Sequence, residues 1–400
     1  MASPDSPNEP QPHSTRPTLF SPPRSAYLHL PFCRYHCGYC NFSVAAGRDY
    51  LIPRYLTAIG LEVEQLPQAL ALETLFLGGG TPSRLEPSQL ARLRGLIESR
   101  LRLQPDAEVT LEANPTDVTP DWIAAAVEFG ATRVSLGAQS FRREKLQQLE
   151  RDHEAETIRQ AVEQLKQAGL TVSIDLIFAA PNELPDQWKA DLQSALQLPI
   201  DHLSTYELTY EKGTRFWNER HAGRLEEQDE DQRSELYRLT LETLAAAGWE
   251  HYEISSFARN GSRCRHNLVY WSGRPYLAFG AGASRFLDGT RGTNHFSTMR
   301  YLKLIEAGLD PTAEQTQLSE QELARELLAI GLRQVQGLCE QSFIETTGFD
   351  FQSAAGAQLP ELAEWGLVEL TGQGRERWLR LTSRGLFLYD AIASRIATGA

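Results

Sequence analysis

The sequence predicts an α/β fold: a partial barrel of six parallel strands, each followed by a helix, joined to a mostly helical, winged-helix-like C-terminal domain. Three observations lead to this prediction. Strand-like and helix-like segments alternate six times between residues 26 and 250, polar residues follow the strand-like segments, and the alternation stops after residue 250.

The strand-like segments are short runs rich in β-branched, aromatic and other apolar residues, bounded by turn residues. They cover residues 26–32, 74–77, 108–112, 133–137, 171–178 and 202–209. Between them, apolar residues recur with the period of a helix that buries one face, as in residues 158–165. Thr119 and Pro120 are typical of a helix start, and Gly130 of a helix end.

This alternation fits either a doubly wound sheet or a partial barrel, and the polar residues favour the barrel. Cys33 follows the first strand, residues 78–81 follow the second, Glu112 ends the third and Gln139 follows the fourth. In a barrel the carboxyl ends of the strands share one mouth, where these side chains would meet. We therefore expect the functional site at that mouth.

Composition divides the chain into four regions. Residues 1–24, rich in proline and serine, are expected to form a disordered tail, with a transit peptide as the alternative. Residues 25–250 form the predicted barrel, residues 251–310 an extension packed against it, and residues 311–400 the winged-helix-like domain. Acidic residues outnumber basic ones in the last region, so a packing or lid role is expected there instead of DNA binding.

The net charge narrows the classes of partner. The 400 residues carry a formal charge of −13, which gives no general attraction to nucleic acid or anionic membrane. No apolar run is long enough to span a bilayer, and the first residues do not resemble a secretory signal. We expect a cytoplasmic protein that binds small molecules and other proteins, with peripheral membrane contact left open.

Three of the five cysteines, Cys33, Cys37 and Cys40, have the spacing C-x3-C-x2-C. An odd number of cysteines, clustered in this way, indicates a metal or redox site more than disulfides. Thiolates suit zinc or an iron–sulfur cluster. Zinc would need a fourth ligand, whereas a [4Fe–4S] cluster on three thiols keeps one iron open for a reactive ligand. The candidates for a fourth zinc ligand are His36, Cys264 and Cys339.

The cysteine spacing, with Tyr39 just before the last thiol, resembles the signature of the radical S-adenosylmethionine (SAM) family. In that family the open iron binds the amino and carboxylate groups of SAM. The resemblance implies four positions near the methionine amino group: Gly79, Gly80, Thr81 and Glu112. It assigns the methionine carboxylate to Arg151, and the ribose hydroxyls to Gln139 and Asp175.

The resemblance narrows over nearly the whole chain after the tail. The stretches YLHLPFCRYHCGYC, LFLGGGTP and RVSLGAQSF resemble motifs of the oxygen-independent coproporphyrinogen III oxidase family, with Tyr27 at a cofactor-contacting position. The oxidase branch carries a further cysteine where this chain has Phe42. The HemW-type haem chaperone branch lacks it and has a His-Asn-x-x-Tyr-Trp motif, which stands here at residues 266–271.

The motif at residues 266–271 suits haem chemically. Its His266 could ligate the iron, Asn267 could orient the imidazole, and Tyr270 and Trp271 offer flat apolar surface. The alternative is a His–Asn pair inside an aromatic core.

The resemblance implies a chaperone that binds a [4Fe–4S] cluster, SAM and haem, and transfers haem to an acceptor protein. A reductant such as flavodoxin or ferredoxin is an expected partner. Two alternatives stay open: a coproporphyrinogen III oxidase that decarboxylates through a 5′-deoxyadenosyl radical, and a zinc-stabilised protein. Whether the chain is an enzyme is undecided at this stage.

Overall fold

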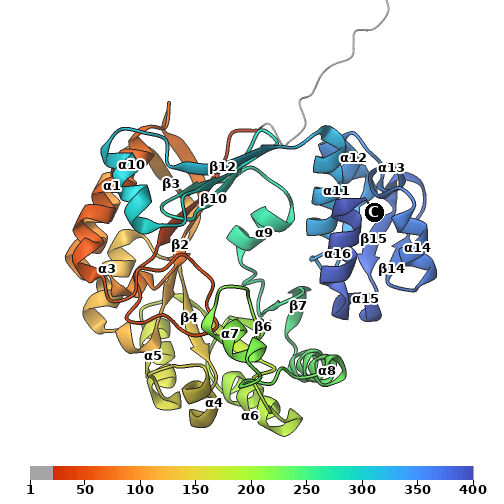
Figure 1. Ribbon diagram of the computed structural model, residues 1–400, viewed down its shortest axis with the longest axis horizontal. Coiled ribbons are helices and arrows are strands. Elements are labelled where there is room, and N and C mark those ends of the chain that lie inside the picture. The colour runs from red at the N-terminus through yellow and green to blue at the C-terminus, as the bar shows by residue number, and fades with distance from the viewer. Residues whose placement is uncertain (1–20, 400) are drawn as a thin grey trace, which may run out of the picture.

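The computed structural model describes residues 21–399, so most of the predicted tail (residues 1–24) lies outside the described residues. A nine-stranded sheet forms the frame, and its six central strands stand side by side in chain order (Figure 1). These strands are β1 (Ser25–Leu30), β2 (Leu70–Gly79), β3 (Leu101–Ala113), β4 (Arg133–Gln139), β5 (Thr171–Phe178) and β6 (His202–Glu207).

The strand order confirms the partial barrel. All five neighbouring pairs from β1 to β6 are parallel, and the order runs from one edge to the other without reversing. A doubly wound sheet reverses its order at a switch point, whereas right-handed crossovers in one direction place every helix on the same side. The curved sheet does not close, because β6 pairs with β8 and β1 with β9.

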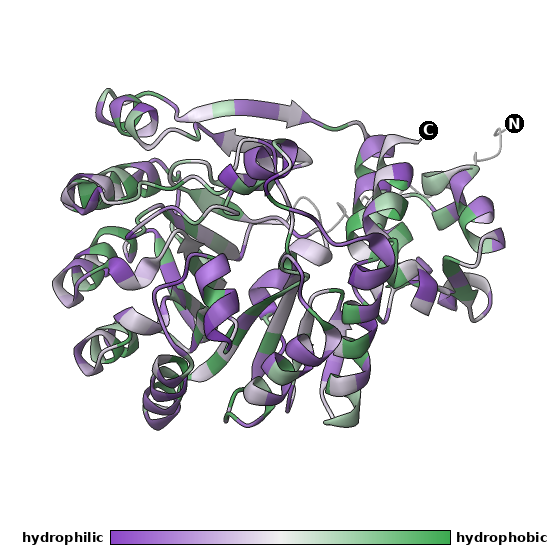
Figure 2. Ribbon diagram, turned by 60° about the horizontal axis from the view of Figure 1, so that its bottom comes forward, coloured by the Kyte–Doolittle hydropathy of each residue, from purple (hydrophilic) through white to green (hydrophobic). Residues whose placement is uncertain are grey.

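Helices between the strands cover the outer side of the sheet, as Figure 1 shows for α1, α3 and α5. The helices of this region are α1 (Ile52–Glu64), α2 (Pro87–Ile97), α3 (Pro120–Phe129), α4 (Arg143–Gln148), α5 (Ala155–Gln167), α6 (Pro185–Leu196), α7 (Arg215–His221) and α8 (Glu230–Ala246). Of these, α7 packs on residues 38 and 39, since Phe216 N donates to the carbonyl of Gly38 (2.9 Å). The predicted start and end of α3 are confirmed: the Thr119 side chain accepts a hydrogen bond from Trp122 N, and Gly130 has a φ of 104°. In Figure 2 the helices carry both hydrophilic and hydrophobic residues, as expected of half-buried elements.

The chain after α8 extends both edges of the sheet. Short antiparallel strands β7 and β8 continue it beyond β6, and β9 pairs in parallel with β1 at the other edge. The elements of this region are β7 (Glu250–Glu253), β8 (Ser256–Ala258), α9 (Arg265–Trp271), β9 (Leu277–Phe279), β10 (Ser284–Leu287), β11 (Thr290–Asn294), α10 (Thr298–Glu306) and β12 (Thr312–Gln317). Figure 1 shows α9 between the barrel strands and the C-terminal domain.

The C-terminal region forms a second hydrophobic core of its own around a small antiparallel sheet in the order β13-β15-β14. Its elements are α11 (Glu320–Gly331), β13 (Leu338–Cys339), α12 (Glu340–Thr347), α13 (Phe351–Ala355), α14 (Gln358–Glu364), β14 (Val368–Thr371), β15 (Trp378–Leu381), α15 (Ser383–Phe387) and α16 (Tyr389–Thr398). The boundaries between the predicted regions stay a prediction. None of the helices between residues 21 and 399 has both the length and the apolar character needed to cross a membrane.

Candidate cluster and cofactor site

The three clustered thiols lie on the loop between β1 and α1, at the carboxyl end of β1. Backbone hydrogen bonds shape this loop: Gly47 N donates to the carbonyl of Cys33 (2.9 Å), and Cys40 N to the carbonyl of Cys37 (3.1 Å). All three cysteines are half-buried. The loop therefore holds them together at the sheltered rim of the barrel mouth.

Neighbouring side chains direct hydrogen-bond donors at two of the thiols. Thr81 Oγ1 donates to Cys33 Sγ over 3.4 Å, and Arg151 Nη1 to Cys37 Sγ over 3.6 Å. Burial, together with the nearby thiols of Cys40 and Cys37, raises the pKa of Cys33 to about 12, although the hydrogen bond from Thr81 opposes the shift. Burial also raises the pKa of Cys40. Because metals bind thiolates, these thiols would ionise as iron binds, and the two donors would stabilise the resulting charge.

The thiol positions separate a cluster from a single metal ion. Across residues 21–399, no three His, Cys, Asp or Glu side chains lie close enough together to hold one ion. His36 Nε2 is bonded to the carbonyl of Cys40 (2.9 Å). Cys264 contacts Glu108, and Cys339 lies in β13 of the C-terminal domain. A [4Fe–4S] cluster takes each thiolate on a different iron and needs no fourth protein ligand, so the chemistry of the three thiols fits it.

The glycine segment that ends β2 lies tightly against β1. A Cβ at Gly79, where φ is 95°, would stand 2.1 Å from His29 Nδ1 and 2.7 Å from the hydroxyl oxygen of Tyr27. A Cβ at Gly80 would stand 2.5 Å from the carbonyl oxygen of Leu30. Only glycine lets the backbone run this close to β1, which brings it beside the start of the cysteine loop.

Two carboxyl groups lie near one another: Glu112 close to the end of β3 and Asp175 in the middle of β5. Glu112 accepts a hydrogen bond from Gly79 N (2.9 Å), yet burial, followed by the charge of Asp175, raises the pKa of Glu112 to about 8. Burial raises the pKa of Asp175 to about 6, although the hydroxyls of Ser204 and Ser135 oppose the shift. No basic side chain contributes to either shift. A ligand with an ammonium group would supply the missing positive charge.

Arg151 and Gln139 lie side by side around Gly137. Arg151 Nη2 donates to the carbonyl of Gly137 (3.0 Å), and Arg151 Nε is buried without a hydrogen-bond partner. A carboxylate ligand would satisfy this N–H, which is costly to leave unpaired. Gln139 has a φ of 65°, a left-handed conformation rare outside glycine. A Cβ at Gly137 would lie 3.1 Å from Gln139 Nε2 and 3.6 Å from Arg151 Nη2, so both side chains face one place.

Two tyrosines flank the site. The Tyr27 hydroxyl is hydrogen-bonded to His29 Nδ1 (3.1 Å), and burial and the nearby Glu112 raise the pKa of Tyr27. The ring of Tyr39 packs edge-on against Phe216 of α7, with the ring centroids 6.0 Å apart, and burial raises the pKa of Tyr39.

The structure thus brings together at the barrel mouth the residues predicted for the cluster and SAM. They are Tyr27, Cys33, Cys37, Tyr39, Cys40, Gly79, Gly80, Thr81, Glu112, Gln139, Arg151 and Asp175. Their individual roles stay predictions.

The predicted haem ligand lies apart from this set, inside the wall of the barrel. His266 has no exposed surface, and its two ring nitrogens are hydrogen-bonded to Thr74 Oγ1 (2.8 Å) and to the Tyr270 hydroxyl (2.7 Å). The sequence suggested that Asn267 could orient the imidazole, but both ring nitrogens are hydrogen-bonded to Thr74 and Tyr270 instead. Sequence reasoning missed Thr74, because one threonine in a buried strand carries no local signal of a partner 192 residues away.

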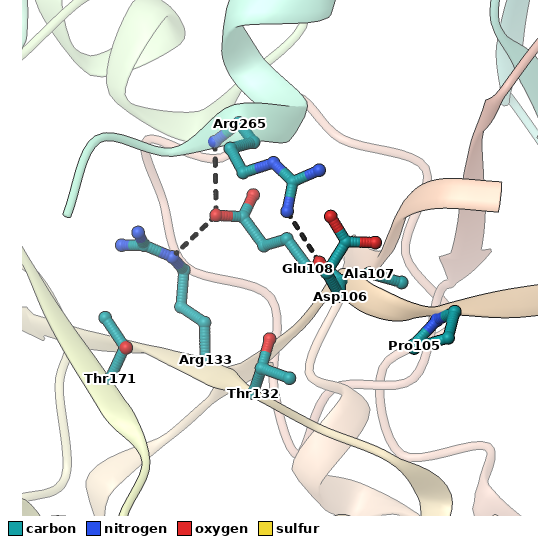
Figure 3. A pocket seen from close by; sticks show the side chains of 8 residues that line it. All are labelled: Pro105, Asp106, Ala107, Glu108, Thr132, Arg133, Thr171 and Arg265. Atoms are coloured by element: carbon teal, nitrogen blue, oxygen red, sulfur yellow. Dashed lines mark hydrogen bonds and ion pairs between the residues drawn. The ribbon is translucent and has the colours of Figure 1, made fainter. Parts of the chain in front are cut away.

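A pocket of about 240 Å³ lies at the other, amino-terminal end of the strands (Figure 3). Within it, Glu108 accepts hydrogen bonds from the backbone N–H groups of Arg265 (3.1 Å) and His266 (2.9 Å) and is ion-paired with Arg133 (3.4 Å). These contacts leave little of the Glu108 carboxylate for a ligand. Glu108 therefore anchors the first turn of α9. Nothing in the sequence had indicated this role.

Comparison with known proteins identifies the family. Residues 27–195 match the Radical SAM superfamily, and residues 318–388 match the HemN C-terminal domain. The chain is 33% identical over 371 residues to the heme chaperone HemW of Lactococcus lactis. The aligned region covers 92% of this chain and 96% of that protein. The chain belongs to the HemW family. Another member, the heme chaperone HemW of Mycobacterium tuberculosis, is 35% identical over 92% of this chain and 94% of its own length.

The fold of this chain matches that of a solved structure. Coproporphyrinogen III oxidase (HemN) from Escherichia coli matches 96% of this chain and 92% of its own chain, with a TM-score of 0.82 and 21% identity. This likeness confirms the predicted radical SAM fold. Membership of the radical SAM superfamily implies a [4Fe–4S] cluster and SAM for this chain, and the residues at the barrel mouth fit both.

Proposed function

We propose that this protein is a haem chaperone, which binds a [4Fe–4S] cluster, SAM and haem and passes the haem to an acceptor protein. The position of α9 carries the proposal. The ring of His266 on α9 packs 5.2 Å from Phe76 of β2, and Trp271 at the end of α9 lies 4.5 Å below the Arg333 guanidinium of the C-terminal region. The motif thus spans from the barrel wall to the C-terminal domain.

The barrel-mouth residues have separate tasks in this proposal. Cys33, Cys37 and Cys40 would hold the cluster, which supplies the electron for reductive cleavage of SAM when that reaction occurs. Arg151 would bind the SAM carboxylate through the Nε–H that has no partner in the protein. Glu112 would accept from the SAM ammonium group, and that contact would favour its ionised form.

Haem has a matching apolar surface around α9. Four aromatic rings form a chain of contacts here. The ring centroids are 5.2 Å apart between Phe76 and His266, 5.0 Å between His266 and Tyr270, and 4.5 Å between Tyr270 and Tyr276. A planar macrocycle packs well against aromatic faces and edges. The acceptor protein, a flavodoxin- or ferredoxin-type reductant and a cytoplasmic location complete the proposal as predicted from the sequence.

The competing function is coproporphyrinogen III oxidation. The fold likeness to the Escherichia coli oxidase supports only a common scaffold at 21% identity. Phe42 stands where the oxidase branch carries a further cysteine, and its side chain is 60% exposed beside the cluster loop. The relatives from Lactococcus lactis and Mycobacterium tuberculosis, which match over most of the chain, are named heme chaperones, and this favours the chaperone.

One anaerobic preparation tests the proposed function. The protein is reconstituted with iron and sulfide, titrated with hemin, and incubated with SAM, dithionite and coproporphyrinogen. We expect one haem per chain and no protoporphyrinogen. A matched Cys37→Ala variant should lose the cluster absorbance and keep haem binding. Failure to bind haem, or turnover of coproporphyrinogen, would contradict the proposal.

A further inference from the structure

The middle of the cysteine loop is fixed at Gly38, between Cys37 and Cys40. The N–H of Gly38 donates to Glu150 Oε2 over 2.7 Å, and its carbonyl accepts from Phe216 N over 2.9 Å. A Cβ at Gly38 would stand 2.5 Å from the ring of Phe216, so the backbone of α7 approaches the loop as closely as only glycine allows. Glu150 and α7 therefore hold the loop through both backbone polar groups of Gly38.

Glu150 occupies a backbone position that usually belongs to glycine. It follows Leu149, the C-cap of α4, and has a φ of 57°, in the left-handed region. Glu150 N donates to the carbonyl of Gln147 (3.1 Å), and Arg151 N to that of Leu146 (2.8 Å), which together form a Schellman motif. Glycine would adopt this conformation without strain, but it has no carboxylate. The strained residue therefore supplies a contact that glycine could not make.

The same turn directs two consecutive side chains at the cysteine loop. Glu150 accepts from Gly38 N, and Arg151, the residue proposed for the SAM carboxylate, donates through Nη1 to Cys37 Sγ (3.6 Å). Arg151 Nη2 donates to the carbonyl of Gly137 (3.0 Å), which fixes the turn to β4. One turn thus joins a backbone N–H group and a thiol of the loop to the proposed SAM site.

The helix α7 reinforces this contact. Arg215 is ion-paired with the Glu150 carboxylate, and the ring of Phe216 packs against Tyr39 with the ring centroids 6.0 Å apart. Phe216 also joins the end of α4 in a small hydrophobic cluster, whose buried members are Leu149, Ile177, Leu208 and Phe216. The Arg215 side chain is 54% exposed, and an exposed ion pair contributes little. The hydrogen bond from Gly38 N, which has a charged acceptor, is therefore the stronger restraint.

We propose that Glu150 is a positioning residue for the [4Fe–4S] cluster, because it holds Gly38 so that Cys37 and Cys40 are arranged for iron before it binds. The inference rests on the cluster of the proposed function and does not depend on haem. Without the Glu150 carboxylate, Gly38 N loses its acceptor and the loop gains freedom at this point. The thiols would then have to be ordered as iron binds, which costs conformational entropy.

The test compares variants of the full-length protein after anaerobic reconstitution with iron and sulfide. Iron per chain is counted, and the decay of the cluster absorbance is followed after an iron chelator is added. Glu150→Ala should lose the cluster about tenfold faster than the unsubstituted protein. In Glu150→Gln the amide oxygen can still accept from Gly38 N, so most of this difference should disappear. Arg215→Gln should change the rate about twofold or less.

A matched control and two further measurements separate positioning from a loss of folding. Glu242→Gln removes the exposed partner of Arg238 on α8 (2.7 Å) and should leave the decay unchanged. The cluster-free forms of Glu150→Ala and Glu242→Gln should melt at the same temperature, because the Glu150 contact restrains one loop and not the core. The EPR signal of the reduced cluster should broaden in Glu150→Ala and recover its shape in Glu150→Gln, since it responds to the arrangement of the thiolates.

Two results would overturn the inference. In the first, Glu150→Ala keeps its cluster as long as the unsubstituted protein does. In the second, Glu150→Gln loses the cluster as fast as Glu150→Ala, so that the bond from Gly38 N is not what matters. An unsubstituted protein that takes up no iron would instead overturn the cluster of the proposed function, and a cluster-loaded protein that binds no hemin would overturn only its haem part.

Discussion

The proposed contact between Glu112 and the SAM ammonium group predicts that SAM binding depends on pH. In the free protein the pKa of this carboxyl is raised to about 8 by burial and by the charge of Asp175. The SAM ammonium group needs the ionised form, so binding below pH 8 must first remove a proton. Affinity should therefore rise with pH. The loss between pH 8 and pH 6 is about 50-fold, or about 2.3 kcal/mol, for a group that titrates near pH 8.

Anaerobic calorimetry measures this linkage directly. SAM is titrated into the cluster-loaded protein at pH 6, 7 and 8, in two buffers with different ionisation enthalpies, so that proton release is counted. Glu112→Gln should bind SAM more weakly at pH 8 and with little dependence on pH. Glu314→Gln removes an exposed carboxylate on β12 and should keep the original pH dependence.

Asp175 gives a second test. Its charge adds to the raised pKa of Glu112, so Asp175→Asn should lower that pKa and move the fall in SAM affinity to lower pH. If SAM binds equally well at pH 6 and pH 8, or if Glu112→Gln keeps the full pH dependence, Glu112 is not the partner of the ammonium group and the reasoning is refuted.

Three predictions concern stability. Gly79→Ala should lower the free energy of unfolding by about 3 kcal/mol, from left-handed strain and the displaced His29, whereas Gly95→Ala, whose Cβ meets nothing, should stabilise slightly. Arg333→Ala should cost about 3 kcal/mol, because it leaves the Glu253 carboxylate (side chain 2% exposed) unpaired, and Arg333→Lys should recover only part of it. Burial raises the pKa of Glu62 from 4.5 to about 7, so its protonated form stabilises the folded state at low pH. As pH rises from 4.5 to 7 the carboxyl ionises, and the free energy of unfolding should fall by about 3 kcal/mol. Glu62→Gln should flatten that window. Denaturant melts at several pH values measure all three effects.

Clear outcomes would contradict these three predictions. Equal stabilities of the Gly79→Ala and Gly95→Ala variants would mean that the close approach of β2 to β1 is not needed. Full recovery by Arg333→Lys would show that charge alone, without stacking on Trp271 and Tyr389, joins the segment after α11 to Glu253 of β7. A pH-independent difference between Glu62→Gln and the unsubstituted protein would show that Glu62 does not titrate there.

Local sequence patterns predicted the six parallel strands and the polar residues at their carboxyl ends. This was possible because hydrophobic periodicity, turn residues and helix caps all depend on residues that are close together in the sequence. The predicted strand at residues 108–112 was shorter than β3, which begins at Leu101. β3 runs through Pro105 and Asp106, two residue types that are uncommon in strands. The local patterns also gave no sign of β9, a strand of three residues that pairs with β1 although Leu277 lies 251 positions after its partner Ala26. Such a short strand is specified by the edge it pairs with and not by its own sequence.

The residues of the candidate site also fall into two groups, those that local sequence patterns predict and those that depend on tertiary packing. The cysteine spacing and the glycine segment are local, so their place at the barrel mouth could be expected from the sequence. The bonds of His266 to Thr74, and of Glu108 to the first turn of α9, depend on which side of each strand faces the helix. The left-handed backbone of Gln139 is another such feature, because nothing in its neighbourhood requires a positive φ. Tertiary packing decides all three.

The measurement that tests the central claim most directly is EPR spectroscopy of the anaerobically reconstituted, dithionite-reduced protein before and after addition of SAM. Three thiolates on a [4Fe–4S] cluster leave one iron for SAM, so we expect about four irons per chain and a cluster signal that shifts when SAM binds. A cluster signal that ignores SAM, or a protein that carries one zinc ion in place of iron, would contradict the account.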